Sequence, residues 1–179
     1  MLLLAPKVTG PQAEGQARIV GEIGPILAPT LDSYDINNKL RIAHFLAQIC
    51  HESNGFVTTE EYATGDAYEG RKDLGNTAPG DGRRYKGRGL FQLAGRANYR
   101  QFGKALNIDL EAEPERAAEP TLALRIACEY WKQRGLNAAA DSDDAVTLTK
   151  RINGGLNGLS ERRMLLAKAK KILSEMPGA

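Results

Sequence analysis

The sequence lacks any apolar run long enough to cross a membrane, which would require about 20 consecutive residues. The apolar stretch near the N-terminus, from Leu2 to Leu4, is also shorter than the roughly 7–15 residues of a signal-peptide core, and no basic region precedes it. We therefore expect a protein that is made and kept in the cytoplasm. A target outside the membrane would then require a separate route of release.

Cysteine and histidine are scarce, with two residues of each type. Their spacing matches no zinc-binding pattern, and no glycine-rich phosphate-binding motif is present, so we expect neither a metal nor a cofactor. Cys50 and Cys128 both fall in apolar stretches with a helical pattern, where free cysteine packs like a small hydrophobic residue. We expect two buried free thiols, although the sequence leaves a disulfide open.

A large excess of charge is also absent. The 24 Lys and Arg residues nearly balance the 22 Asp and Glu residues, and a net charge of +2 does not indicate a nucleic-acid-binding protein. The length of 179 residues predicts one domain, 1–179, which is large enough to bury a core without disulfides. Hydrophobic residues at 42% and charged residues at 26% exclude a disordered chain or a collagen.

Helical periodicity dominates most of the chain. The clearest helix covers residues 36–52, where apolar residues form a wide face and Asp35 is placed to cap the N-terminus. Residues 12–33 also have near-helical spacing, but Pro25 and Pro29 predict a broken helix or two short ones. Further helices are expected at 96–106, 119–134, 143–152 and 160–174. The predicted fold class is therefore mainly α.

Glycine is concentrated in one segment. Residues 53–95 hold nine of the 19 glycines, and a stretch of this length with so many turn-forming residues is too long for a simple connection. Long loops inside compact domains usually carry function. We expect a glycine-rich lobe inserted between the helices.

Two acidic residues flank the start of this lobe. Glu52 ends an apolar helix, where the helix dipole and the apolar surroundings both favour the protonated form that a general acid requires. Glu61 follows nine residues later in a loop. Paired carboxylates in unequal environments are the groups that perform glycoside hydrolysis. The alternatives are an ordinary glutamate at a helix end and a solvated acidic pair in a turn.

Two further segments offer groups that suit a sugar ligand. In the segment 85–99, Gln92 and Asn98 supply amides, and Tyr85 and Phe91 supply rings for packing on sugar faces. The second segment, 151–158, contains Asn-Gly-Gly after a helix. Ordinary core packing and ordinary turn chemistry are the respective alternatives.

Together these segments resemble the family 19 glycoside hydrolases, which include plant-type chitinases and many phage lysis enzymes. The matching pieces occur in the family's order within residues 36–172: His51-Glu52-Ser53, then Tyr85 to Tyr99 with its Gly-Arg-Gly and Gln-Leu core, then Ile152-Asn153-Gly154-Gly155. The stretch from Tyr68 to Asn76 is similar in particular to short bacteriophage endolysins of this family.

The resemblance implies a lysozyme-like, mainly helical fold in which two lobes flank a cleft lined by the glycine-rich lobe. It also implies hydrolysis, with inversion, of a β-1,4 bond next to an N-acetylated amino sugar. Glu52 then resembles the general acid and Glu61 the general base, about 6.5–9.5 Å apart. Glu60 and Glu69 are the rival bases, although Glu69 has Arg71 as an alternative partner.

One position departs from the family pattern. The chitinases carry Ser or Thr directly after Gln-Leu, where its hydroxyl helps to hold the catalytic water, but this chain has Ala94. Thr121, at a helix start that resembles one carrying Thr in the family, is the candidate replacement, and Arg162 resembles a family arginine near the base. The remaining sugar-binding positions implied by the resemblance are His51, Tyr85, Arg88, Gln92, Asn98 and Asn153.

The first functional hypothesis is an endolysin that cuts the bond between N-acetylmuramic acid and N-acetylglucosamine in bacterial peptidoglycan. We expect a monomer in the host bacterial cytoplasm that a separate pore-forming protein releases to lyse the host. The basic C-terminal helix, with Arg162, Arg163, Lys168, Lys170 and Lys171, is either a contact for an anionic envelope or a solvated face. A chitinase is the second hypothesis, and a catalytically inactive wall-binding module is the third.

Overall fold

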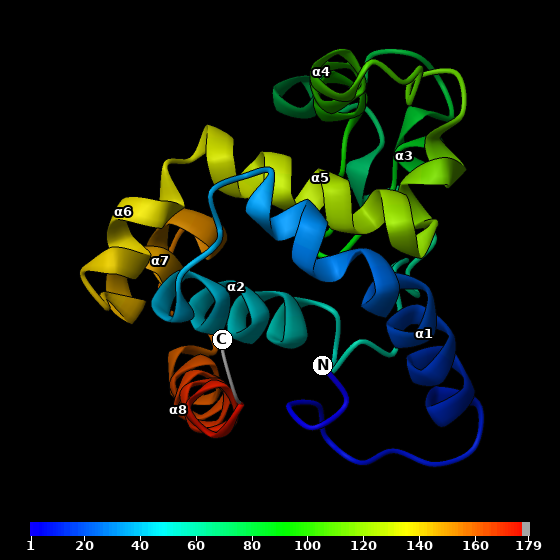
Figure 1. Cartoon of the computed structure of the whole chain (residues 1–179). Helices are drawn as coiled ribbons and strands as arrows, with labels where there is room; N and C mark the ends of the chain where they lie inside the picture. The colour runs from blue at the N-terminus through cyan, green and yellow to red at the C-terminus, as the bar shows by residue number, and fades with distance from the viewer. Residues whose placement is uncertain (177–179) are drawn as a thin grey trace.

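The structure, a computed structural model that describes residues 1–176, is built from helices joined by turns (Figure 1). The last three residues of the predicted 1–179 domain therefore lie outside the described part. The helices are α1 (Pro11–Asp32), α2 (Lys39–Glu52), α3 (Asp81–Arg84), α4 (Arg96–Leu106), α5 (Pro120–Gln133), α6 (Leu136–Asp141), α7 (Ala145–Asn153) and α8 (Leu159–Glu175). Short 3-10 turns are η1 (Asp66–Tyr68), η2 (Lys72–Leu74) and η3 (Pro114–Ala118). The mainly α prediction is confirmed, since residues 1–176 contain only isolated β-bridges and no strand.

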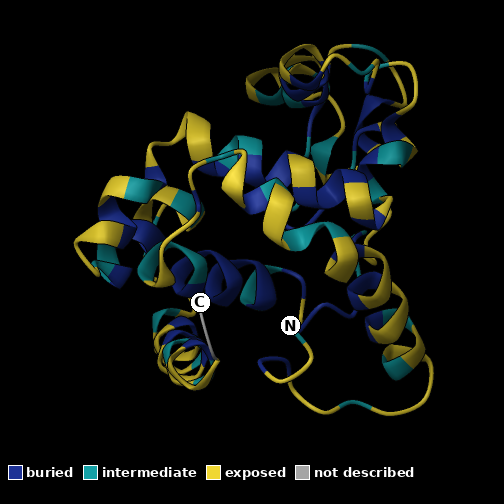
Figure 2. Ribbon diagram, viewed as in Figure 1, coloured by how far each residue is buried: buried dark blue, intermediate teal, exposed yellow. Residues whose placement is uncertain are grey.

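Helix α2 runs through the centre of the molecule. The side chains from Ala43 to Cys50 are all buried, so this helix is covered on every side rather than on one face (Figure 2). The helix begins at Lys39 because the side chain of Asn38 accepts a hydrogen bond of 2.9 Å from the Arg41 backbone. The predicted start at residue 36 with an Asp35 cap is therefore wrong; Asp35 lies in the preceding turn with a φ of 58°.

The buried polar groups of α2 have partners from neighbouring elements. His44 Nε2 lies 2.8 Å from Asp143 Oδ1, and burial lowers the pKa of His44 despite this carboxylate. The side chain of Gln48 accepts a hydrogen bond from Arg162 of α8, the helix that packs along α2. These contacts satisfy polar groups that would otherwise destabilise a fully buried helix.

Helix α1 is continuous where the sequence predicted a break. It runs from residue 11 to residue 32 through Pro25 and Pro29, and it bends along its length (Figure 1). Each proline removes one backbone hydrogen bond, and bending is the usual response of a helix. The helix persists because one of its faces is buried against the core and packs on α5; the buried apolar residues of that face are Ile19, Val20, Ile23 and Leu31.

Helix α5 separates two hydrophobic clusters. One face of α5 enters the larger cluster with Ala123, Leu124, Ala127, Cys128 and Trp131. Leu122 and Ile126, on the other face, join a smaller cluster with residues of α4 and the glycine-rich segment. We call the parts around these clusters the large lobe and the small lobe. The two lobes match the lysozyme-like architecture that the sequence predicted.

The predicted helices at 96–106, 119–134, 143–152 and 160–174 all form, with ends within about two residues of the expected positions. Helices α3 and α6 were not predicted, because elements of four and six residues are too short to develop a periodic pattern. The N-terminal residues contribute Leu4 and Ala5 to the buried core.

The glycine-rich segment 53–95 is ordered by bonds between side chains and backbone. Asn76 is fully buried; its amide donates to the Tyr68 carbonyl, and its oxygen accepts from the Arg96 backbone. The carboxylate of Asp81 accepts from the backbone N–H groups of Thr77 and Ala78. Such bonds replace the regular backbone ladders that this segment does not form.

Both cysteines are free and buried, and burial raises the pKa of Cys50 and of Cys128 to about 12. We predict that neither thiol reacts with Ellman's reagent at pH 8 in the folded protein, because almost no thiolate is present. In denaturant without reductant both thiols should react. Rapid labelling of the native protein, or no labelling after denaturation, would contradict this assignment.

Candidate active site

Glu52 is the last residue of α2 and is held by an arginine. Arg162 of α8 is only 3% exposed, and its Nη2 donates to Glu52 Oε1 at 2.5 Å. The same guanidinium donates from Nη1 to Gln48 and from Nε to the Asn157 carbonyl at 3.3 Å. No protein hydrogen bond reaches Glu52 Oε2 among residues 1–176, so this oxygen remains available to a ligand.

The expected place of Arg162 near the base stays a prediction, since the ion pair that the structure shows for Arg162 is with Glu52. Arg162 contacts Glu52, the predicted acid, because α8 packs along α2 and brings the arginine beside the end of that helix. Glu61, the predicted base, is bonded instead to groups of the glycine-rich segment.

Three predicted residues, His51, Asn153 and Arg162, all contact the loop 153–158. The exposed Asn153 donates from Nδ2 to the Asn157 carbonyl, which also accepts from Arg162. The His51 ring packs so closely on Gly158 that any Cβ at this position would overlap it, and Gly158 also has a φ of +72°. His51 Nδ1 lies 3.0 Å from Glu161 Oε2, without hydrogen-bond alignment.

Glu61 is oriented by a backbone group and a tyrosine. Its Oε1 accepts from the Gly87 N–H at 2.6 Å, and its Oε2 accepts from the Tyr68 hydroxyl at 3.1 Å. The Glu61 N–H in turn donates to the Gly87 carbonyl. A Cβ on Gly87 would lie 2.9 Å from Gln92 Oε1 and 3.2 Å from Glu61 Cδ, so glycine is what permits this close approach.

The rival acids occupy different surroundings. Lys86 Nζ and Arg88 Nε both lie 3.1 Å from Glu60 Oε1, so Glu60 is part of a charge network. Both oxygens of Glu69 accept backbone N–H groups, from Gly80 and Gly82, each at 2.7 Å. These bonds give Glu69 a structural role at the start of α3.

The alternative pairing of Glu69 with Arg71 is wrong. The Arg71 guanidinium pairs instead with the carboxylate of Asp73, two residues further along the chain. The physical reason is local: the backbone N–H groups of Gly80 and Gly82 already use both Glu69 oxygens.

Tyr85 and Arg88 are buried, so the prediction that they contact the substrate directly is wrong. Tyr85 is 2% exposed; its hydroxyl donates to the Glu111 carbonyl, and its ring packs in the small-lobe cluster. Arg88 is 8% exposed, and it donates to Glu60, to the Arg84 carbonyl and to the Tyr99 hydroxyl. Glycine-rich flanking sequence masked the core character of both residues.

Phe91, the other ring considered for sugar packing, is partly covered by protein. It stacks on the Tyr130 ring with centroids 4.9 Å apart and meets the edge of Phe45. Tyr62 behaves differently: it is 79% exposed and directly follows Glu61. No sequence signal distinguished Tyr62 from the buried tyrosines.

The remaining predicted residues are placed as follows. Gln92 adopts a φ of 51° and donates to the Gly89 carbonyl, while its buried Oε1 has no partner in the described part of the chain. The Asn98 amide donates to the carbonyl of Ala94. Thr121 is exposed in the first turn of α5, and its hydroxyl forms no hydrogen bond to residues 1–176. The sugar-binding and catalytic roles of these residues stay predictions.

Sequence reasoning missed residues that support the two acids. Gln48 lies four residues before Glu52, one helical turn away on the same face, and this spacing was a usable signal. Tyr68 lies in the endolysin-like stretch, but nothing in its sequence context marks a hydroxyl aimed at Glu61. Tyr130 donates to the Ile152 carbonyl, and burial, aided by the nearby Glu52 charge, raises its pKa.

The described residues contain no group of three His, Cys, Asp or Glu side chains arranged to hold a metal ion. Within the same residues, no helix is both long and apolar enough to span a bilayer.

Comparisons with known proteins show which family the chain belongs to. The sequence matches the family model described as chitinase class I over residues 26–154. A glycosyl hydrolase family 19 domain-containing protein of Haemophilus influenzae is 36% identical over 156 residues, covering 70% of this chain and 76% of that protein.

A plant relative and a solved structure agree with this match. An Arabidopsis thaliana endochitinase is 36% identical over 118 residues, 65% of this chain, and the chain covers only 40% of that protein's length. The crystal structure of chitinase C from Streptomyces griseus has the same fold, with a TM-score of 0.71 and 21% identity over 97% of this chain and 81% of that one. The chain belongs to glycoside hydrolase family 19, a family of chitinase-like glycoside hydrolases.

Proposed function

We propose that this glycoside hydrolase cleaves bacterial peptidoglycan between N-acetylmuramic acid and N-acetylglucosamine, by an inverting mechanism, as an endolysin. The observation that carries the proposal is the pair of carboxylates, Glu52 on the large lobe and Glu61 on the glycine-rich segment, held by different groups. Unequal surroundings allow one carboxylic acid to donate a proton while the other accepts one.

Glu52 acts as the general acid in this proposal. Its Oε2 forms no hydrogen bond within residues 1–176, and in the proposal the proton on this oxygen passes to the oxygen of the leaving sugar. The carboxylate that results is negative, and the Arg162 guanidinium at Oε1 stabilises that charge. Arg162 also prevents rotation of the side chain, because it is itself held by Gln48 and Asn157.

Glu61 acts as the general base. It removes a proton from a water that attacks the anomeric carbon from the opposite side, which inverts the configuration. The Gly87 N–H and the Tyr68 hydroxyl orient the carboxylate. Thr121 is proposed to hold this water, since its exposed hydroxyl has no acceptor or donor in the described chain and position 94 is alanine.

The endolysin role rests on supporting features rather than on the carboxylates. Arg163, Lys168 and Lys171 are exposed on α8 and provide a basic surface for an anionic envelope. The proposal includes a monomer in the host cytoplasm and a separate pore-forming protein that gives access to the wall. A chitinase is the second candidate, because the named plant and Streptomyces relatives are chitinases.

The proposed roles of the acidic residues predict losses in kcat of different size for their glutamine variants. Glu52→Gln and Glu61→Gln should each lower kcat by about 10²–10⁴-fold, the usual contribution of a general acid or base. Glu60→Gln, the adjacent carboxylate, should lower it by less than about tenfold because Lys86 and Arg88 already occupy it. Thermal unfolding controls for folding. Equal losses in Glu60→Gln and Glu61→Gln would reassign the base.

The two hydroxyls predict smaller effects. Tyr68→Phe and Thr121→Ala should each lower kcat by about tenfold, the value of one hydrogen bond to a charged or reacting group. Unchanged kcat in Thr121→Ala would remove the water-holding role from this residue.

The substrate is tested on two purified polymers, peptidoglycan sacculi and chitin. We expect soluble fragments from sacculi that carry N-acetylmuramic acid at their reducing ends by mass spectrometry. NMR of the first product should show the α-anomer, the configuration opposite to the β-linkage that is cut. Release from chitin alone would favour the second candidate, and binding to sacculi without turnover would favour an inactive wall-binding module.

A further inference from the structure

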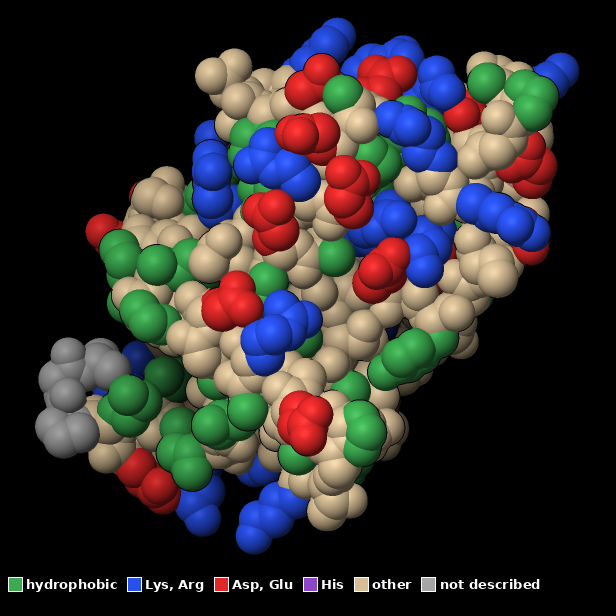
Figure 3. All heavy atoms as spheres, turned by 90° about the vertical axis from the view of Figure 1, so that its right-hand side faces the viewer, with side chains coloured by type: hydrophobic (Ala, Val, Ile, Leu, Met, Phe, Trp, Pro, Cys, Tyr) green, Lys and Arg blue, Asp and Glu red, His purple; other side chains and the backbone are tan. Residues whose placement is uncertain are grey.

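The small lobe carries a charged groove that the two catalytic carboxylates do not line. Two hollows, of about 760 and 640 Å³, meet at Asp109 and Glu111 beside helix α4. We call them together the α4 groove. In Figure 3, Lys and Arg side chains are interspersed with Asp and Glu side chains over the upper part of the face, where the small lobe lies.

Positive side chains line the helical wall of the α4 groove. Arg96, Arg100 and Lys104 are spaced by four residues on α4, so they project from the same side of the helix. Arg84, from the end of α3, extends this row. The opposite wall is formed by the segment 107–112, which includes the exposed Asp109.

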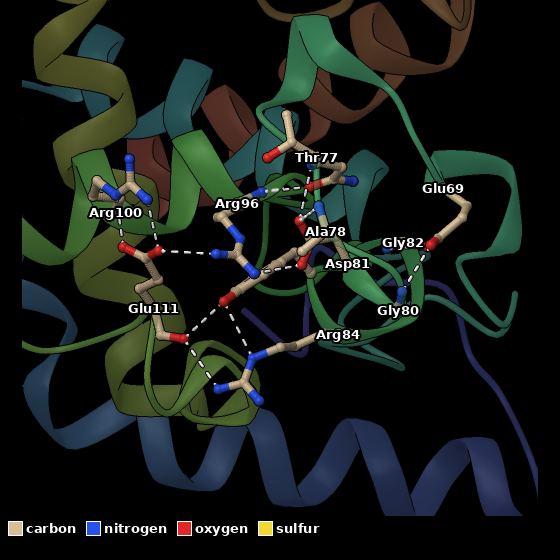
Figure 4. Close-up of polar contacts among 12 residues, drawn as sticks. Glu69, Thr77, Ala78, Gly80, Asp81, Gly82, Arg84, Arg96, Arg100 and Glu111 are labelled. Atoms are coloured by element: carbon tan, nitrogen blue, oxygen red, sulfur yellow. Dashed lines mark hydrogen bonds and ion pairs between the residues drawn. The ribbon is translucent and has the colours of Figure 1, made fainter.

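Part of this charge is paired within the groove. Arg100 donates to both oxygens of Glu111, at 2.6 and 2.7 Å, and Arg96 Nη2 donates to Asp81 at 2.5 Å (Figure 4). The hydrogen bond from Arg100 lowers the pKa of Glu111, with further contributions from Arg96 and Lys104. These pairs fix the walls of the groove and keep Glu111 negative at neutral pH.

Arg84 has no carboxylate partner within ion-pair distance among residues 1–176. Its Nε donates to the Tyr85 hydroxyl at 3.1 Å, and its Nη2 donates to the carbonyls of Glu111 and Ala112. The guanidinium also lies over the Tyr85 ring, 5.6 Å from the centroid. Its Nη1 has no protein acceptor in the described chain, although the residue is exposed (Figure 4).

Arg84 is thus an ordered cation with donors directed to solvent. Neutral carbonyls and a hydroxyl hold it in place but leave its charge uncompensated. A ligand that binds such a group loses little side-chain entropy, because the arginine is already positioned. Planar guanidinium groups of this kind favour carboxylates, which accept two parallel hydrogen bonds. Lys104 lies further along the groove and has no ion-pair partner within the described residues either.

We propose that the α4 groove binds the stem peptide of peptidoglycan, with Arg84 and Lys104 receiving its carboxylates. This inference rests on the proposed function and specifies its substrate class. Stem peptides carry several carboxylates and often a free amine, whereas chitin carries no charge. Asp109, which is exposed on the opposite wall, is placed to accept the amine. A groove with both signs of charge fits such a peptide better than a polymer that carries only phosphates.

The test compares intact sacculi with sacculi from which an amidase has removed the stem peptides. In the double variant Arg84→Gln/Lys104→Gln, the concentration of intact sacculi at half-maximal rate should rise about tenfold, the value of one charge-assisted hydrogen bond. The rate on stripped glycan should not change. Arg83→Gln is the matched control, since Arg83 is an exposed neighbour that pairs with Asp66 outside the groove.

Soluble probes identify the recognised chemistry. A free stem tetrapeptide should inhibit the parent protein on intact sacculi, and the same peptide with amidated carboxylates should not. Inhibition by inorganic phosphate as strong as that by the tetrapeptide would overturn the assignment to a peptide carboxylate. If the concentration of sacculi at half-maximal rate rose equally in the double variant and in Arg83→Gln, binding in the α4 groove would be contradicted.

The experiments distinguish failure of peptide binding in the α4 groove from failure of the proposed function. If the parent protein hydrolyses neither form of the sacculi, the proposed function fails, and calorimetric titration of the tetrapeptide into the parent and the double variant decides the groove alone. Binding that the double variant loses supports the groove. No binding to the parent protein overturns it.

Discussion

The contact on which the site depends is the ion pair between the buried Arg162 and the partly exposed Glu52. Helix α2 is covered on all sides, so any charge at its end must be satisfied by another element of the protein. Arg162 supplies that charge from α8 and uses its remaining donors on Gln48 and Asn157. Removing Glu52 would leave the buried Arg162 guanidinium without its carboxylate, which destabilises the fold.

Glu52 and Glu61 are held in different ways. Glu52 sits at the end of a rigid helix and is fixed by a cation. Glu61 belongs to a segment without regular structure, so its position depends on the Gly87 backbone and the Tyr68 hydroxyl. A helix end positions its side chain through packing, whereas the turn segment needs a separate hydrogen bond for each oxygen.

The sequence predicted the mainly helical fold and five of the helices, because burial and helical periodicity act over many neighbouring positions. His51, Asn153 and Arg162 were named only through the resemblance to the family. The prediction from sequence failed at α1, where packing against α5 outweighs the prolines, and at Asp35, where Asn38 caps α2 instead. The continuity of α1 depends on packing against α5, which is distant in the chain. The start of α2 depends on which of several polar side chains accepts a hydrogen bond from the backbone. A local sequence pattern shows neither.

The site residues show the same limit. Tyr85 and Arg88 lie among glycines and carry groups suited to a sugar, yet both are buried, since the small lobe needs a core of its own. The resemblance supplied Arg162 but not its contact with Glu52, because a resemblance preserves the residue type and does not specify which partner it contacts. Only the packing of α8 along α2 decides that.

Helix α5 connects the two halves of the site. Near its start, Thr59 Oγ1 donates to the Ala118 carbonyl at 2.6 Å, which ties the chain just before Glu61 to the turn that leads into α5. Near its other end, Tyr130 donates to the Ile152 carbonyl beside the loop that surrounds Glu52. Because α5 and the turn before it are bonded to both sides, they constrain the separation of Glu52 and Glu61. An inverting mechanism requires such a constraint, since a water molecule must fit between the base and the sugar.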